Sequence, residues 1–108
     1  MKEIAEIEQI ISDGIQSPQL AAELRIELSA KYSRECGRLE EILKVKPKIW
    51  LEMRKNTKSD TSATRNWEGS ELGTEEMIIR LRLKRLEKLI SCLTSFLKVK
   101  ENEAKNIY

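Results

Sequence analysis

The chain has 108 residues and a net charge of +2, with 35% charged residues, 5% aromatic residues and no histidine. Its length predicts a single domain, and its wealth of Leu, Ile, Glu, Lys and Arg is typical of helices. The lack of histidine excludes the commonest general base, the usual nucleophile pairs and the usual zinc ligand. We therefore expect a protein that is not an enzyme and has no cofactor or metal.

Two cysteines, Cys36 and Cys92, are too few for a four-cysteine metal site. Both lie on apolar rows of predicted helices, which favours reduced core thiols over a disulfide. No apolar run approaches the roughly 18 residues that a membrane span requires, and the N-terminus is acidic where a signal peptide is basic. These features predict a soluble, intracellular protein without membrane contact.

Residues 1–16 predict an N-terminal arm that contains a short helix with the apolar stripe Ile4, Ile7 and Ile11, ended by Gly14. Ser17 and Pro18 suit an N-cap and first helical position, so a second helix is expected over residues 17–46. The first apolar residues of this helix are four positions apart, which is more than the average heptad spacing, so the apolar row drifts around the helix axis. The row comprises Leu20, Leu24, Leu28, Tyr32, Cys36, Leu39 and Leu43, with Ile26 and Ile42 beside it.

Residues 47–73 predict a broken helical connector. Pro47 indicates a kink or boundary at Lys46, since proline lacks the amide hydrogen of a helix interior. A helical piece to residue 55, a polar loop over 56–59, a short helix capped by Ser59 or Asp60, and a break over 69–73 are expected. The buried candidates of the first piece are Ile49, Trp50, Leu51 and Met53.

Residues 74–108 predict one long helix, which Thr74 caps and which would be about 50 Å long. One row alternates steps of four and three, the repeat of a coiled-coil seam, and a second row on a neighbouring face requires cover on two sides. The seam row is Ile79, Leu83, Leu86, Ile90, Leu93, Leu97, Lys100, Ala104 and Ile107, and the second row is Ile78, Leu81, Leu89, Cys92, Phe96 and Val99.

The predicted architecture is all-α: an antiparallel helical hairpin or coiled coil with a broken connector and a short N-terminal helix. Because an elongated chain of this size buries little surface alone, we expect a homo-oligomer, with a dimer favoured. Lys100 either sets the register of that seam or lies beyond its end, exposed. The expected oligomer interface is Ile79, Leu83, Leu86, Ile90, Leu93 and Leu97.

Charge is uneven along the chain. Residues 44–65 carry seven basic and two acidic residues, and residues 79–97 carry five basic and one acidic residue. If the hairpin closes, both blocks lie near one end with Trp50 and Trp67, where rings stack on bases and cations meet phosphates. The alternative is a solvated helix face and core tryptophans. The candidate binding residues are Lys44, Lys46, Lys48, Trp50, Arg54, Lys55, Lys58, Arg65, Trp67, Arg80, Arg82, Lys84, Arg85 and Lys88.

Three further pieces carry a resemblance: Lys58-Ser59-Asp60, residues 63–73 (Ala-Thr-Arg-Asn-Trp-Glu-Gly-Ser-Glu-Leu-Gly) and residues 102–106 (Asn-Glu-Ala-Lys-Asn). Together they resemble small helical-hairpin bacteriophage proteins of unknown function found near recombination or replication genes. The resemblance implies a phage origin, an all-helical fold, the cytoplasm of a bacterial host and no enzyme activity. It supplies no site residues.

Three classes of function follow. The first is a non-enzymatic phage accessory protein that presents the basic, Trp-containing end to nucleic acid or to a nucleic-acid-processing partner. The second is an anti-defence inhibitor, similar to anti-CRISPR proteins, that binds a host protein. The third is a purely structural assembly coil.

Overall fold

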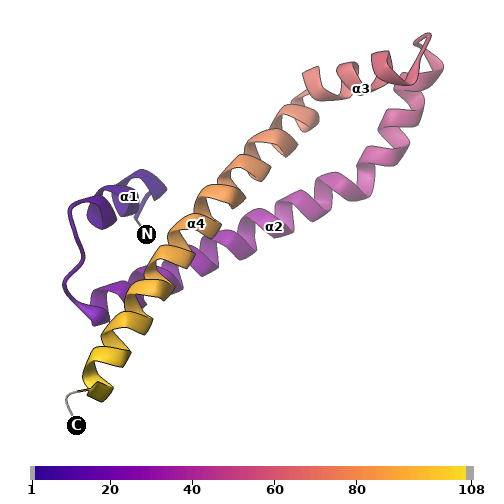
Figure 1. Cartoon of the computed structure of the whole chain (residues 1–108). Coiled ribbons are helices and arrows are strands. Elements are labelled where there is room, and N and C mark those ends of the chain that lie inside the picture. The colour runs from indigo at the N-terminus through magenta and orange to yellow at the C-terminus, as the bar shows by residue number, and fades with distance from the viewer. Residues whose placement is uncertain (1, 107–108) are drawn as a thin grey trace. The chain divides into compact units, whose positions relative to one another are not determined.

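The structure, a computed structural model, describes residues 2–106, so Ile107 of the seam row lies outside the described residues. Its helices are α1 (Ile4–Ser12), α2 (Pro18–Lys55), α3 (Asp60–Gly69) and α4 (Glu71–Asn106). The part of the chain that is described contains no strand. The long helices α2 and α4 run antiparallel (Figure 1), which confirms the all-α hairpin.

The chain divides into two compact units. In the first unit, residues 1–33 with 84–108, Ile7 of α1 packs with residues of α2 and α4. In the second unit, residues 34–83, Trp67 of α3 packs with Ile42 of α2 and Ile79 of α4. α4 is thus covered by a second helix besides α2 in each unit, as the width of its apolar arc indicates. The buried cluster of the first unit is Ile7, Ala21, Leu24, Leu28, Leu86 and Leu93.

The predicted helix end at Gly14 and the predicted helix start at Ser17 are confirmed. Gly14 ends α1 with a positive φ of 95°, which glycine adopts without a Cβ clash. Ser17 caps α2, because its Oγ accepts a hydrogen bond from the Leu20 amide at 3.3 Å. The predicted loop over 56–59 is also present, and Ser59 caps α3 by accepting from the Ser62 amide.

The sequence predicted a kink or a boundary at Lys46, and the boundary is wrong, because α2 continues through Pro47 to Lys55. A proline inside a helix costs about 3 kcal/mol. The turns after it offset this cost by packing Ile49, Trp50 and Met53 against the second-unit cluster. In Figure 1 the last part of α2 turns away from the line of the preceding turns, as is usual for a helix with an internal proline.

The predicted cap at Thr74 is also wrong, because α4 begins at Glu71. The Ser70 hydroxyl bridges the two helices: it donates to the Trp67 carbonyl at 2.5 Å and accepts from the Gly73 amide at 3.1 Å. A Cβ on Gly73 would lie 1.7 Å from the Trp67 carbonyl oxygen. Glycine therefore allows the end of α3 and the first turn of α4 to meet in one tight corner.

Several residues predicted to be buried are instead exposed. Their positions fall on the outer faces of α2 and α4, where the partner helix does not reach, because two helices cover each other along a stripe only. These residues are Ile26 (69% exposed), Leu43 (37%), Leu51 (57%), Ile78 (39%), Leu81 (55%), Val99 (54%) and Cys92.

Candidate nucleic-acid interface

A buried glutamate, Glu76, is the centre of a polar cluster in the second unit. Its carboxylate accepts hydrogen bonds from Trp67 Nε1 on α3 and from Arg80 Nε on α4, both at 2.9 Å, and pairs with Lys46 Nζ on α2 at 3.0 Å. Lys46 Nζ also lies 5.4 Å from the centroid of the Trp67 ring, a cation–π distance. The cluster therefore connects all three helices of the unit.

The surroundings of Glu76 fix its charge. Burial raises the pKa of this carboxyl, but hydrogen bonds from Lys46, Trp67 and Arg80 outweigh burial and bring the pKa to about 2. A general acid or base works best with a pKa near the working pH. Glu76 is thus suited to holding the helices in register and unsuited to proton transfer.

The expectation that Trp67 stacks on a base is wrong. Trp67 is 2% exposed, because its ring fills the core between α2 and α4. Trp50 packs against the same cluster, and its Nε1 donates to Thr64 Oγ1 at 3.2 Å. Only Trp50 keeps part of its surface in solvent. Both rings therefore serve the core of the second unit, as the alternative interpretation of the sequence has it.

Six of the twelve candidate cations pair with acids of their own unit. The surface pairs contribute little stability, but they reduce the positive charge offered to a ligand. The pairs are Lys44 with Glu40 (3.4 Å), Lys46 (3.0 Å) and Arg80 (2.9 Å) with Glu76, Arg54 with Asp60 (2.6 Å), Arg82 with Glu35 (3.3 Å), and Arg85 with Glu8.

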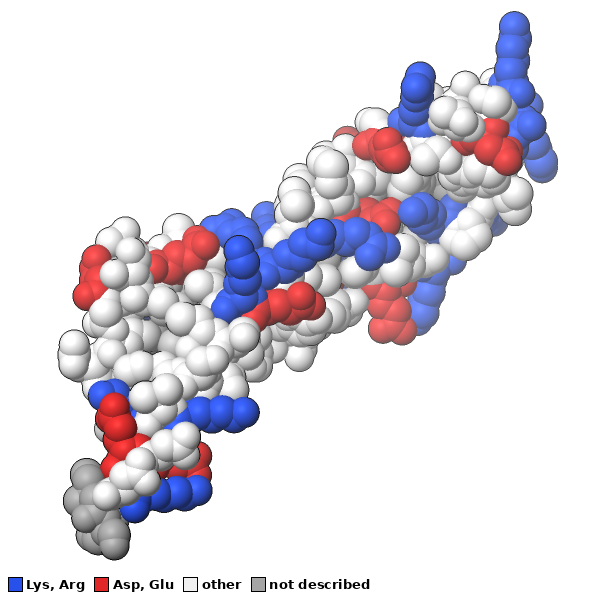
Figure 2. Space-filling view, viewed as in Figure 1, with Lys and Arg blue, Asp and Glu red and all other residues white. Residues whose placement is uncertain are grey.

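Four cations of the second unit stay exposed, and no acidic side chain among residues 2–106 pairs with them. They are Lys48, Lys55, Lys58 and Arg65, which we call the basic end. Lys and Arg side chains project where α2 passes into α3 (Figure 2). The remaining candidates, Lys84 and Lys88, are likewise exposed but belong to the first unit.

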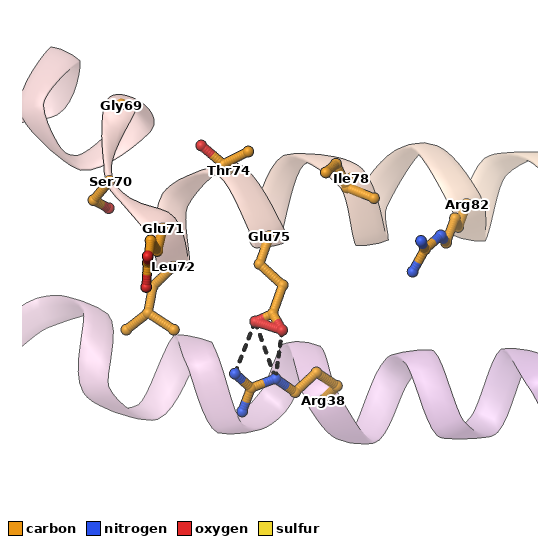
Figure 3. A pocket seen from close by; sticks show the side chains of 9 residues that line it. All are labelled: Arg38, Gly69, Ser70, Glu71, Leu72, Thr74, Glu75, Ile78 and Arg82. Carbon is orange, nitrogen blue, oxygen red and sulfur yellow. Dashed lines mark hydrogen bonds and ion pairs between the residues drawn. The ribbon is translucent and has the colours of Figure 1, made fainter.

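The sequence analysis missed a groove of 660 Å³ between α2 and the start of α4 (Figure 3). In it Arg38 holds Glu75 with Nε–Oε1 at 2.9 Å and Nη2–Oε2 at 2.8 Å, while Nη1 reaches Glu41 at 2.9 Å. The Arg38 hydrogen bonds lower the pKa of Glu75. The pairing with Glu75 left no signal in the sequence, since it depends on the register of α2 against α4.

The six residues expected to form an oligomer interface are covered within one chain. Ile79, Leu86 and Leu93 are 1%, 0% and 1% exposed. The other three are half-buried against the same two clusters, because α1, α2 and α3 already occupy this side of α4. This row is therefore not a free surface for a second copy. The half-buried residues are Leu83, Ile90 and Leu97.

Lys100 fits neither of its two predicted roles completely. The helix continues past it to Asn106, yet every residue from 101 to 106 is exposed. Its Nζ lies 5.7 Å from the centroid of the Phe96 ring and 3.4 Å from Glu103. Lys100 thus covers the last apolar turn of α4 with its stem while its ammonium stays at the surface.

Both cysteines are free, Cys36 half-buried and Cys92 exposed. Within residues 2–106 no three His, Cys, Asp or Glu side chains gather as they would around a metal ion. No helix in the same residues combines the length and apolarity of a membrane span.

Comparison of the chain with protein-family models, curated proteins and solved structures finds no match.

Proposed function

We propose that the protein is a non-enzymatic helical module that binds nucleic acid through the basic end. The observation that supports this most directly is the contrast between paired and unpaired cations. Lys48, Lys55, Lys58 and Arg65 have no acidic partner among the described residues, whereas Lys46 and Arg54 near them pair with Glu76 and Asp60. Unpaired cations gathered on one part of a surface attract phosphates.

The proposal includes the role of an accessory to phage recombination or replication in a bacterial host, as the resemblance of residues 58–60, 63–73 and 102–106 implies. It requires no reaction. The most perturbed carboxyl, Glu76, is ionised and saturated by donors, and the second, Glu75, is held by Arg38. Neither group is free to act on a bound strand.

A salt titration tests the proposal. The affinity for a fluorescently labelled oligonucleotide duplex is measured by anisotropy at several salt concentrations. If the four cations of the basic end each meet a phosphate, log affinity falls against log salt with a slope of about −3.5. The double variant Lys55→Gln/Lys58→Gln should bind more weakly and reduce the magnitude of that slope by about 2.

The control is Lys2→Gln/Lys98→Gln, which removes the same charge from exposed positions of the first unit. It should retain the affinity and the slope of the unmodified protein. Absence of binding at low salt, or an equal loss in both double variants, would contradict a nucleic-acid site at the basic end.

A further inference from the structure

Resting on the proposed function, we infer that the protein grips the phosphate backbone with one line of lysines on α2 and stacks no base on Trp50. The line is Lys44, Lys48 and Lys55, which we call the lysine ridge. The consequence is recognition without base reading: a duplex is bound at least as tightly as a single strand of equal length.

The helical spacing places the lysine ridge on one face. Steps of four and seven residues return to within about 40° of the same direction on a straight α-helix. Pro47 lies between Lys44 and Lys48, whereas Lys48 and Lys55 both follow it and are about 10 Å apart along the axis. All three side chains are exposed. Leu51, 57% exposed, lies on the same face. Lys48 and Lys55 therefore form one exposed strip of α2 after Pro47, and Lys44 extends it on the turn before the proline.

Lys44 belongs to the ridge despite its contact with Glu40. The two side chains are 73% and 69% exposed and 3.4 Å apart, and an exposed pair four residues apart on a helix is a weak interaction. A phosphate therefore competes for Lys44 easily. Glu52 is exposed on α2 beside the ridge, and its negative charge repels a phosphate bound there.

Trp50 points to another side of the helix. Two residues after Lys48 correspond to a rotation of about 200° around an α-helix axis. The ring is packed against the second-unit cluster, and its Nε1 donates a hydrogen bond to Thr64. Stacking on a base would break this hydrogen bond and withdraw the ring from the core. Cations and ring are thus on different sides, so a strand lying along the ridge does not meet the ring.

The test compares a duplex with a single strand of the same length, and measures tryptophan emission during each titration. We expect the duplex to bind at least as tightly, with emission unchanged, since Trp50 stays in the core. Lys48→Gln/Lys55→Gln should reduce the magnitude of the salt slope by about 2, whereas Lys84→Gln/Lys88→Gln, equal in charge but on α4 of the first unit, should not.

Each other outcome has a separate meaning. Tighter binding of the single strand together with quenched emission would overturn the ridge and leave the proposed function standing. An equal loss of slope in both double variants would also overturn the ridge. If neither oligonucleotide binds the unmodified protein, the proposed function itself is contradicted.

Discussion

Glu76 shows how one buried charge is stabilised in this protein. The sequence places it next to Glu75 in a pair of acids, and adjacent helix residues point about 100° apart. That difference sends Glu76 into the core toward Lys46, Trp67 and Arg80, while Glu75 meets Arg38 at the groove. The two neighbours therefore make different contacts, both structural.

Replacing Glu76 by glutamine should make the free energy of unfolding depend less on pH in the acidic range. The folded pKa of about 2 lies below the ordinary value of 4.5. The carboxylate therefore contributes stability that is complete above about pH 4.5 and is lost as the pH falls toward 2. We expect Glu76→Gln to lose on the order of 2 kcal/mol at pH 7, because Lys46 and Arg80 lose their acid.

Urea denaturation between pH 7 and pH 2 measures both effects. Glu68→Gln is the control, since Glu68 is exposed and its side chain makes no ion pair among the described residues. Its curve should match the unmodified protein, and part of the acid dependence should persist in every variant because the pKa of Glu75 is also lowered. An acid dependence in Glu76→Gln as steep as that of the unmodified protein would refute this account.

At the scale of an element, the corner between α3 and α4 depends on Gly73. This glycine is buried inside α4, yet an added Cβ would lie 1.7 Å from the Trp67 carbonyl oxygen and 2.6 Å from its carbon. Both atoms are backbone, so no side-chain rotation relieves the clash. The close approach also keeps Trp67 next to Glu76, three residues along α4 from Gly73.

Gly73→Ala should destabilise the protein by about 2–3 kcal/mol, since the corner must open to admit the methyl group. Gly37→Ala is the matched control: Gly37 lies inside α2 with no atom within 4 Å of an added Cβ. That change should stabilise by about 0.5–1 kcal/mol, because alanine favours a helix interior. Thermal unfolding followed by circular dichroism compares the two. A Gly73→Ala variant as stable as Gly37→Ala would show that the corner is not tight.

At the scale of the whole molecule, the seam row of α4 is used inside the chain. Leu86 is fully buried in the first-unit cluster, where residues of α1 and α2 pack with those of α4. The six residues of the expected dimer interface are thus buried or half-buried within one chain.

Leu86→Ala should cost about 2–5 kcal/mol, the usual range for a leucine truncated in a core. Because the core closes within one chain, the urea midpoint should not change with protein concentration, in the variant or in the unmodified protein. Leu81→Ala, at an exposed position of the same helix, should leave the midpoint nearly unchanged. A midpoint that rises with concentration would mean that a second copy completes the fold.

The sequence by itself determined the elements of this protein. Apolar spacing located the long helices, and Gly14, Ser17 and Ser59 marked ends that the structure confirms. These signals are local, because a cap or a left-handed turn depends on a few neighbouring residues. The sequence prediction was wrong at Pro47, where packing of the following turns outweighed a local signal, and at the start of α4, where Ser70 bridges Trp67 and Gly73.

Only the tertiary structure decided how the charges and the two tryptophans are used. Lys46 and Glu76 lie thirty residues apart, and nothing in that separation indicates that their side chains form an ion pair. Their contact requires one register of α2 against α4, and that same register buries Trp67 and leaves Lys48 and Lys55 unpaired. Composition fixes the number of charges, but packing decides which of them neutralise each other.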